Sequence, residues 1–163
     1  PDGQEEIAPS FAHHGADDLP VIEEDGVWAR VLLGAPLGLA SKVKTSSPMS
    51  YMHWELEPGG VARIEATFPE RAAYVAKGAV EAEGRRIEAG TMLVFAAGGD
   101  ATVTALEPAT VMTIAGEPVG PRFIDWNFVS SSKDRLEQAR ADWRAGRMKL
   151  PDFDHEEFIP LPE

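Results

Sequence analysis

The sequence contains no cysteine, so disulfide bonds and thiolate metal sites are excluded. No apolar run approaches the roughly 20 residues that a membrane-spanning helix needs. The first fifteen residues are polar and lack the apolar segment of a signal peptide. These absences together predict a cytoplasmic protein without a membrane segment. An initiator methionine is also missing before Pro1, which indicates either methionine removal or a fragment of a longer protein.

Basic residues are few compared with acidic ones. The chain has 15 Lys and Arg against 27 Asp and Glu, which gives a formal net charge of -12. A surface of this sign repels the phosphate backbone of DNA and RNA. The composition therefore argues against direct binding of nucleic acid.

Sequence motifs of nucleophilic and nucleotide-binding enzymes are also missing. There is no Gly-x-Ser-x-Gly, no phosphate-binding loop and no dinucleotide fingerprint. The serines at 130–132 are more typical of a helix cap than of a catalytic cluster. We therefore predict no catalytic and no cofactor-binding residue in this chain.

The histidines do not form a metal-binding pattern. They lie at His13, His14, His53 and His155. Adjacent side chains of an extended segment point to opposite sides, so the first two fit a solvated linker with at most adventitious metal. His53 shares a strand face with Glu55, which favours a hydrogen-bonded structural role. His155 lies in the C-terminal tail, where we expect it to be either docked against the protein or exposed.

The residues that are present predict a mainly β protein. Hydrophobic residues make up 44% of the 163, and 15 Gly and 13 Pro are spread as turn residues. About eight strands with turns every 8–12 residues indicate a sandwich or barrel. Asp25-Gly26 is a strong hairpin signal, and residues 50–56 alternate between an apolar and a polar face. We also expect a hairpin across Lys77-Gly78, between strands at 72–76 and 79–83.

The C-terminal part predicts one helix. Ser131 is the expected N-cap, with Asp134 three residues later in a capping-box arrangement. Leu136, Ala139 and Trp143 form one apolar stripe, and Gly146 suits the position after the helix. The aromatic residues around Trp126 and Phe128 are expected in a core or an interface. The predicted organisation is a lead-in or linker at 1–20, a β-barrel at 21–129, a helix at 130–147 and an extended docking tail at 148–163.

The stretch 90–105 carries glycines at the spacing of the second metal-binding motif of cupin barrels. In that motif a glycine is followed by Pro-x-Gly, then by a metal-binding histidine and an asparagine. The corresponding positions here are Gly90, Ala96, Gly98, Ala101 and Ala105. Both glycines are present, but the proline, histidine and asparagine positions are all alanine. We therefore expect a hairpin with the cupin frame and without its ligands.

The first cupin motif, anchored on Gly78, is equally without ligands. Its carboxylate position is Arg71, and its two histidine positions are Glu65 and Thr67, or Ile64 and Ala66 in the other register. Neither register supplies an imidazole, which a divalent metal in such a barrel requires. A substitute site from Glu65 and Glu70 would need further ligands that the sequence does not offer. The sequence predicts no metal site in this chain.

Four C-terminal segments resemble the end of pirin-family proteins. They are residues 116–121, 126–131, 141–147 and 157–162. Leu19-Pro20, followed by residues 24–27, is similar to the entry into the second half of the same family. The resemblance covers essentially the whole chain, but only the C-terminal half of a pirin.

This resemblance implies a single cupin jelly-roll barrel (a double-stranded β-helix) with one C-terminal helix and an extended tail. Pirins are two-barrel cupins in which the N-terminal barrel holds iron, and members are linked to quercetin 2,3-dioxygenase activity. Eukaryotic members are linked to redox-dependent transcriptional regulation through protein partners. None of the family's metal ligands can be assigned here, so the chain alone is not expected to be an enzyme. The expected partners are the missing N-terminal half, a second copy, or transcription regulators. Apart from the resemblance, a barrel of about eight strands has room for a small apolar molecule, and Ala96, Ala101 and Ala105 would leave space where imidazoles would otherwise stand.

Overall fold

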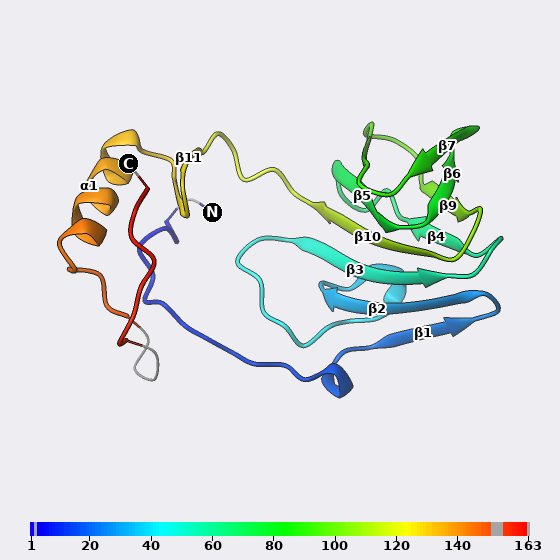
Figure 1. Cartoon of the computed structure of the whole chain (residues 1–163), viewed down its shortest axis with the longest axis horizontal. Coiled ribbons are helices and arrows are strands. Elements are labelled where there is room, and N and C mark those ends of the chain that lie inside the picture. Colours follow the sequence, from blue (N-terminus) through cyan, green and yellow to red (C-terminus); the bar gives the residue numbers. More distant parts are fainter. Residues whose placement is uncertain (2, 151–154, 163) are drawn as a thin grey trace. The chain divides into compact units, whose positions relative to one another are not determined.

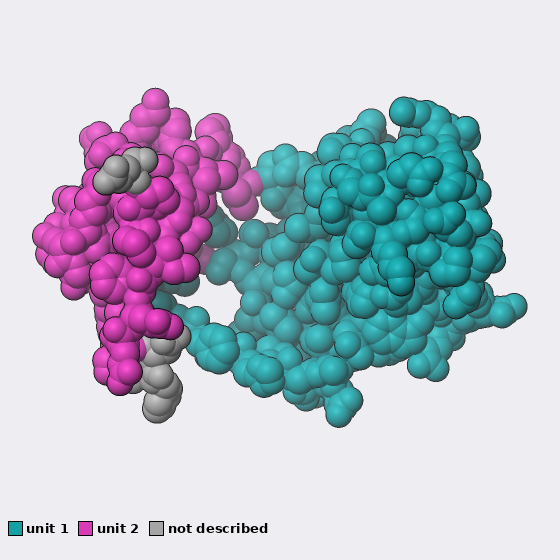
Figure 2. All heavy atoms as spheres, viewed as in Figure 1, with its two compact units in different colours: residues 1, 6–118 teal, residues 2–5, 119–163 magenta. Residues whose placement is uncertain are grey.

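The computed structural model describes residues 1, 3–150 and 155–162 and divides into two compact units. The first unit comprises residues 1 and 6–118, and the second comprises the described residues among 2–5 and 119–163 (Figure 2). No helix in the described part of the chain is long and apolar enough to cross a membrane. Each unit has its own architecture.

The first unit consists of two antiparallel sheets (Figure 1). In spatial order the six-stranded sheet contains β1 (Val21–Glu24), β2 (Val27–Leu33), β3 (Met49–Leu56), β10 (Ala109–Gly116), β5 (Glu70–Lys77) and β8 (Met92–Phe95). The four-stranded sheet contains β4 (Val61–Ile64), β9 (Ala101–Ala105), β6 (Ala79–Ala82) and β7 (Arg85–Glu88). Two short 3₁₀ turns, η1 (Ala16–Asp18) and η2 (Pro36–Gly38), complete the unit.

The core lies between the inner faces of these two sheets. As the alternation predicts, Met52, Trp54 and Leu56 of β3 point inward and are at most 3% exposed. They belong to one cluster with residues of both sheets, among them Val31, Val75, Val111, Val80 and Val103. Two sheets that share one core are the arrangement of a jelly roll, which confirms the predicted fold class.

The predicted hairpin at Asp25-Gly26 is correct, but the one at Lys77-Gly78 is wrong. β1 and β2 pair through this two-residue turn, with Glu24 opposite Val27. β5 pairs with β10 and β8, whereas β6 pairs with β7 and β9, so the chain changes sheet at Gly78. A Cβ atom at Gly78 would lie 2.3 Å from the carbonyl oxygen of Pro108. The glycine therefore marks a close crossing of two backbones.

The stretch 90–105 is also not a hairpin. β8 pairs with β5 in the larger sheet, and β9 pairs with β4 and β6 in the smaller one. The glycines Gly98 and Gly99 lie in the connection between the sheets. Alternation along a strand shows which face is apolar, but it does not show the strand's partner. The two halves of this stretch therefore lie on opposite sides of the core.

The second unit contains a hairpin and the one helix. β11 (Phe123–Asp125) pairs with β12 (Phe128–Ser130), and α1 spans Lys133–Arg144. The N-cap is Ser132, one residue later than predicted, and its side chain accepts a hydrogen bond from the backbone N–H of Arg135. The backbone N–H of Ser131, the predicted cap, donates to the carboxylate of Glu5.

The apolar stripe and the end of α1 agree with the sequence pattern. Leu136 and Ala139 are buried, and Gly146 has the left-handed φ of 65°. The N–H of Gly146 donates to the carbonyl of Trp143, and the N–H of Arg147 donates to that of Asp142. These two hydrogen bonds form a Schellman motif, which ends the helix.

Four aromatic rings form a chain of contacts in the second unit. Trp126 contacts Phe128 and Trp143, and Trp143 contacts Phe158, with ring centroids 5.5–5.7 Å apart. The indole N–H of Trp143 also donates to the carbonyl of Ile159 at 3.0 Å. Part of the predicted tail, residues 151–154 and 163, lies outside the described residues, and the predicted segment boundaries stay a prediction.

Candidate functional site

The predicted ligand positions of the first motif lie at one end of the space between the sheets. Glu65 and Thr67 follow β4 and line a cavity of about 140 Å³ together with Met52 and Thr113. The backbone N–H of Leu37 donates to the Glu65 carboxylate at 2.7 Å. Glu65 and Thr67 therefore line the same cavity.

Arg71, at the carboxylate position, is a buried cation. Its residue is 3% exposed, and its guanidinium group donates only to backbone carbonyls. Nη1 bonds to Gly99 at 3.0 Å and, more weakly, to Ile64 at 3.4 Å, while Nη2 bonds to Ala96 at 2.8 Å. This side chain ties the end of β4 to the connection between β8 and β9.

The alanines of the second motif do not share one place. Ala96 is exposed in the loop after β8, Ala101 is half-buried at the start of β9, and Ala105 is 2% exposed in the core. They do not line the cavity beside Glu65. The predicted gap left by absent imidazoles is therefore not one empty site.

These residues do not fit an iron centre. Glu65 is the single carboxylate of the 140 Å³ cavity, and no imidazole lines it. The described residues contain no group of three His, Cys, Asp or Glu side chains arranged to hold a metal ion. A positive guanidinium group buried at the carboxylate position also disfavours a second cation nearby. The absence of a metal site in this chain stays a prediction.

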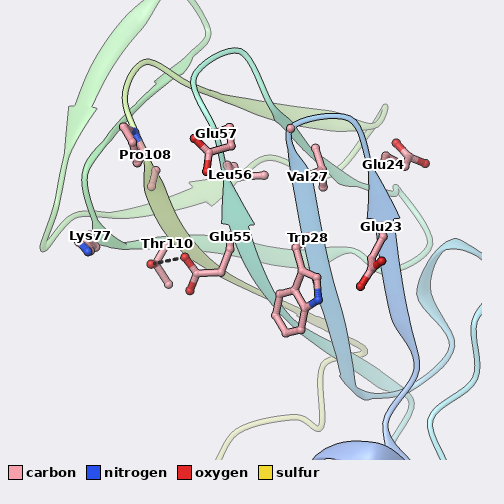
Figure 3. A pocket seen from close by; sticks show the side chains of 12 residues that line it. Glu23, Glu24, Val27, Trp28, Glu55, Leu56, Glu57, Lys77, Pro108 and Thr110 are labelled. Carbon is pink, nitrogen blue, oxygen red and sulfur yellow. Dashed lines mark hydrogen bonds between the residues drawn. The ribbon is translucent and has the colours of Figure 1, made fainter.

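A second hollow lies on the outer face of the six-stranded sheet (Figure 3). It has a volume of about 370 Å³ and acidic side chains around it. Glu55 accepts a hydrogen bond from the hydroxyl of Thr110 at 2.9 Å and lies 2.7 Å from Nε2 of His53. Trp28 packs edge-on against His53, and Arg30 lies 4.8 Å from the Trp28 ring centre.

This outer-face network supports the structural role predicted for His53. The sequence spacing indicates the pair of His53 and Glu55, but it does not indicate Trp28, Arg30 or Thr110. These residues come from β2 and β10, whose pairing with β3 is non-local. The network depends on this strand pairing, which the sequence spacing does not indicate. The hydroxyl of Thr110 donates to Oε2 of Glu55, whereas Nε2 of His53 lies against Oε1 of the same carboxylate.

The second unit holds a carboxylate that sequence reasoning missed. Glu5 accepts hydrogen bonds from the Ser130 hydroxyl at 2.8 Å and the Ser131 N–H at 3.2 Å, and it lies 3.5 Å from Arg122 Nε. The hydrogen bonds from Ser131 and Ser130, helped by the charge of Arg122, lower the pKa of Glu5 to about 2. Ser130 and Ser131 therefore bind a carboxylate, and Ser132 caps the helix.

Comparison with known proteins agrees with this fold. The family described as the pirin C-terminal cupin domain matches residues 51–149. The chain belongs to the pirin family. A pirin-like protein of Caulobacter vibrioides is 60% identical over 160 residues, which cover 98% of this chain and 56% of the relative. Human pirin is 28% identical over 148 residues, covering 85% of this chain and 50% of human pirin.

A solved structure superposes on nearly the whole chain. The crystal structure of a quercetin 2,3-dioxygenase from Acinetobacter baumannii superposes with a TM-score of 0.81 at 28% identity, covering 97% of this chain and 54% of that chain. The chain thus spans about half the length of the curated relatives it matches. It corresponds to the C-terminal cupin of the family.

Proposed function

We propose that this chain is the metal-free, non-catalytic C-terminal cupin of a pirin-type protein, whose N-terminal half carries an iron-dependent quercetin 2,3-dioxygenase-like site. The observation that supports this most directly is Arg71. Its buried guanidinium group stands at the position of a metal-binding carboxylate and bonds to the backbone of Ala96 and Gly99. The reaction of the whole protein therefore belongs to residues outside this chain.

The similarity to the Acinetobacter quercetin 2,3-dioxygenase supports the reaction class for the longer protein. The part of that enzyme that superposes, 54% of its length, corresponds to this chain, and no imidazole lines the 140 Å³ cavity here. In this proposal the C-terminal cupin has a structural role, which is to stabilise the N-terminal half. A cysteine-free chain needs no oxidising compartment, so we keep a cytoplasmic location as part of the proposal.

Iron content and quercetin oxidation test this proposal. The 163-residue chain is compared with a fusion in which the first half of the Caulobacter relative precedes Pro1. We expect iron near one per chain and quercetin consumption in the fusion only. Stoichiometric iron or quercetin oxidation in the short chain would contradict the metal-free assignment, and an iron-free, inactive fusion would contradict the role of the absent half.

Adventitious metal needs its own control. His13 and His14 lie in the lead-in segment and can bind metal nonspecifically. Changing both to alanine should remove any weak metal from the short chain without changing the iron content of the fusion. Tight iron that survives this double change would place a metal site elsewhere in the chain.

A non-enzymatic interaction module is the second candidate function. The second unit exposes large apolar side chains, with Ile124 at 74%, Val129 at 58% and Ile159 at 71%. Exposed apolar groups of this kind mark interaction surfaces. The partners we propose are the N-terminal half, a second copy, or transcription regulators as the family resemblance implies. Deleting residues 151–163 should then weaken the association of the short chain with the separately expressed Caulobacter first half and leave the first unit folded.

A further inference from the structure

Glu65 lies between two adjoining hollows of the first unit. One is the 140 Å³ cavity described above, and the other is a cleft of about 650 Å³. Glu65 and Arg63 line both of them. The larger hollow has the size that is typical of small-molecule sites.

The walls of the smaller hollow are mainly apolar, and those of the larger one combine apolar side chains with the charged residues Glu23, Glu24, Arg63 and Glu65. The smaller one is lined by Met52, Ile64 and Phe68, and the larger one by Ile22, Leu39 and Trp54, among others. The hydroxyl-bearing residues Ser50, Thr67 and Thr113 add polar groups to the smaller one. Apolar walls with a few polar groups are the usual chemistry of a small-molecule pocket.

The turn η2 borders both hollows. Pro36 lines the smaller one, and Leu37 lines the larger one. Leu37 has a φ of 53°, in the left-handed region that residues other than glycine rarely adopt. Its N–H donates to Oε2 of Glu65 at 2.7 Å, so the carboxylate holds a strained turn in place. Strained residues held by specific contacts cluster at binding sites.

The charges restrict the class of ligand. The described structure shows no other hydrogen bond of Glu65, which leaves the acceptor capacity of its carboxylate toward the hollows. Glu65 and two further carboxylates, Glu23 and Glu24, line the larger hollow and disfavour an anionic ligand there. Among the described residues, Arg63 is the one cation of that lining, and its guanidinium group lies 3.8 Å from the Glu24 carboxylate. A neutral molecule that donates a hydrogen bond fits this lining, because it brings no negative charge to the carboxylates.

We propose that the adjoining hollows on either side of Glu65 bind a small neutral molecule that has an apolar ring and a hydroxyl group. The ring packs against the apolar walls, and the hydroxyl donates to the Glu65 carboxylate. The side chain of Trp54 lines the larger hollow, and its indole N–H donates to the hydroxyl of Thr113 in the smaller one. The Trp54 indole N–H is therefore a reporter for both hollows. This site goes beyond the proposed function and does not depend on iron in the other half.

Titration of the 163-residue chain with 4-methylphenol and with toluene tests the site. The two probes share the ring, but only 4-methylphenol has the hydroxyl donor. We expect 4-methylphenol to shift the NMR signal of the Trp54 indole N–H saturably and to bind at least fivefold more tightly than toluene. No saturable shift, or equal affinities for the two probes, would overturn the proposal even if no variant folds.

Substitutions then locate the contact. Glu65→Gln should weaken 4-methylphenol at least fivefold and leave toluene within twofold. Glu70→Gln, at a carboxylate that lines neither hollow, is the matched control and should leave both affinities unchanged. Ala35→Phe at the exposed rim of the smaller hollow should reduce the binding of 4-methylphenol. Unchanged 4-methylphenol affinity in a folded Glu65→Gln chain would refute the role of Glu65.

Discussion

At the scale of single residues, Arg71 shows how a cupin frame without metal ligands is stabilised. A metal in this place would hold neighbouring strands and loops by coordination. Here a guanidinium group makes three hydrogen bonds to carbonyls of Ile64, Ala96 and Gly99. Hydrogen bonds to charged groups contribute more than neutral ones. The buried arginine therefore serves as a cross-link between segments distant in sequence.

Replacing Arg71 by methionine should destabilise the first unit. Methionine has a similar length but leaves the three carbonyls without their donor, so we expect a loss of about 1–3 kcal/mol in the free energy of unfolding. Urea unfolding measures the change. Arg85→Met, at an exposed position of β7, is the control and should change stability by less than about 0.5 kcal/mol. Equal effects of the two substitutions would show that the Arg71 hydrogen bonds contribute nothing.

The second residue-scale prediction concerns Glu5 and pH. Its folded-state pKa of about 2 lies below the ordinary value of 4.5. A lowered carboxyl pKa stabilises the folded state fully above about pH 4.5 and loses this contribution as the pH falls toward 2. The NMR signal of the Ser131 amide should therefore titrate at low pH. In Glu5→Gln this titration should vanish, and its persistence would show that Glu5 is not the group responsible.

At the scale of elements, the alternation of apolar and polar residues predicts which face of a strand is buried, but it does not predict which strands pair. The alternation of residues 50–56 correctly places Met52 and Trp54 in the core. The sequence predicts a hairpin at Gly78, but the strands on its two sides do not pair with each other. β5 and β6 are adjacent in sequence and belong to different sheets because both bury apolar faces from opposite sides of one core. The pairing depends on contacts far apart in the chain, which periodicity does not contain.

In the candidate site, too, the sequence indicates positions along the chain but not the long-range contacts that these residues make. The motif spacing points to Arg71 and to Glu65 and Thr67, or to Ile64 and Ala66 in the other register. Ile64, Glu65 and Thr67 line the smaller cavity, so the cavity does not distinguish the two registers. The contacts of Arg71 and the role of Leu37 could not be predicted. They depend on backbone carbonyls and on a left-handed φ that side-chain sequence does not encode.

Two glycines allow the sheet crossing to be tested. Gly78 and Gly84 have φ values of 73° and 75°, so alanine is strained at both. A Cβ atom at Gly78 would also meet the Pro108 carbonyl oxygen at 2.3 Å, whereas nothing lies within 4 Å at Gly84. We expect Gly84→Ala to cost about 1–2 kcal/mol and Gly78→Ala about 2–4 kcal/mol. Thermal and urea unfolding compare the two, and a Gly78→Ala cost no larger than that of Gly84→Ala would argue against the close crossing.

At the scale of the whole molecule, charge and apolar exposure oppose each other. A net charge of -12 keeps copies of the chain apart. The second unit presents Ile124 and Val129 as an exposed cross-strand pair on β11 and β12. The net charge follows directly from the sequence composition. The exposed apolar pair follows only from the register of the β11–β12 hairpin. Association of the chain should therefore depend on both salt and these two side chains.

Light scattering at increasing protein concentration tests this balance. We expect the 163-residue chain to associate, and to associate more strongly in 0.5 M than in 0.05 M NaCl, because salt of about this strength shortens the range of charge repulsion to a few ångströms. Changing Ile124 and Val129 together to serine should reduce the association at both salt concentrations, since it removes the exposed apolar pair. The matched control is Met92→Ser with Val94→Ser, which removes two exposed apolar side chains from β8 of the first unit. A chain that stays monomeric at high concentration and high salt would contradict the predicted self-association, and equal effects of the two double changes would show that the β11–β12 pair has no special part in it.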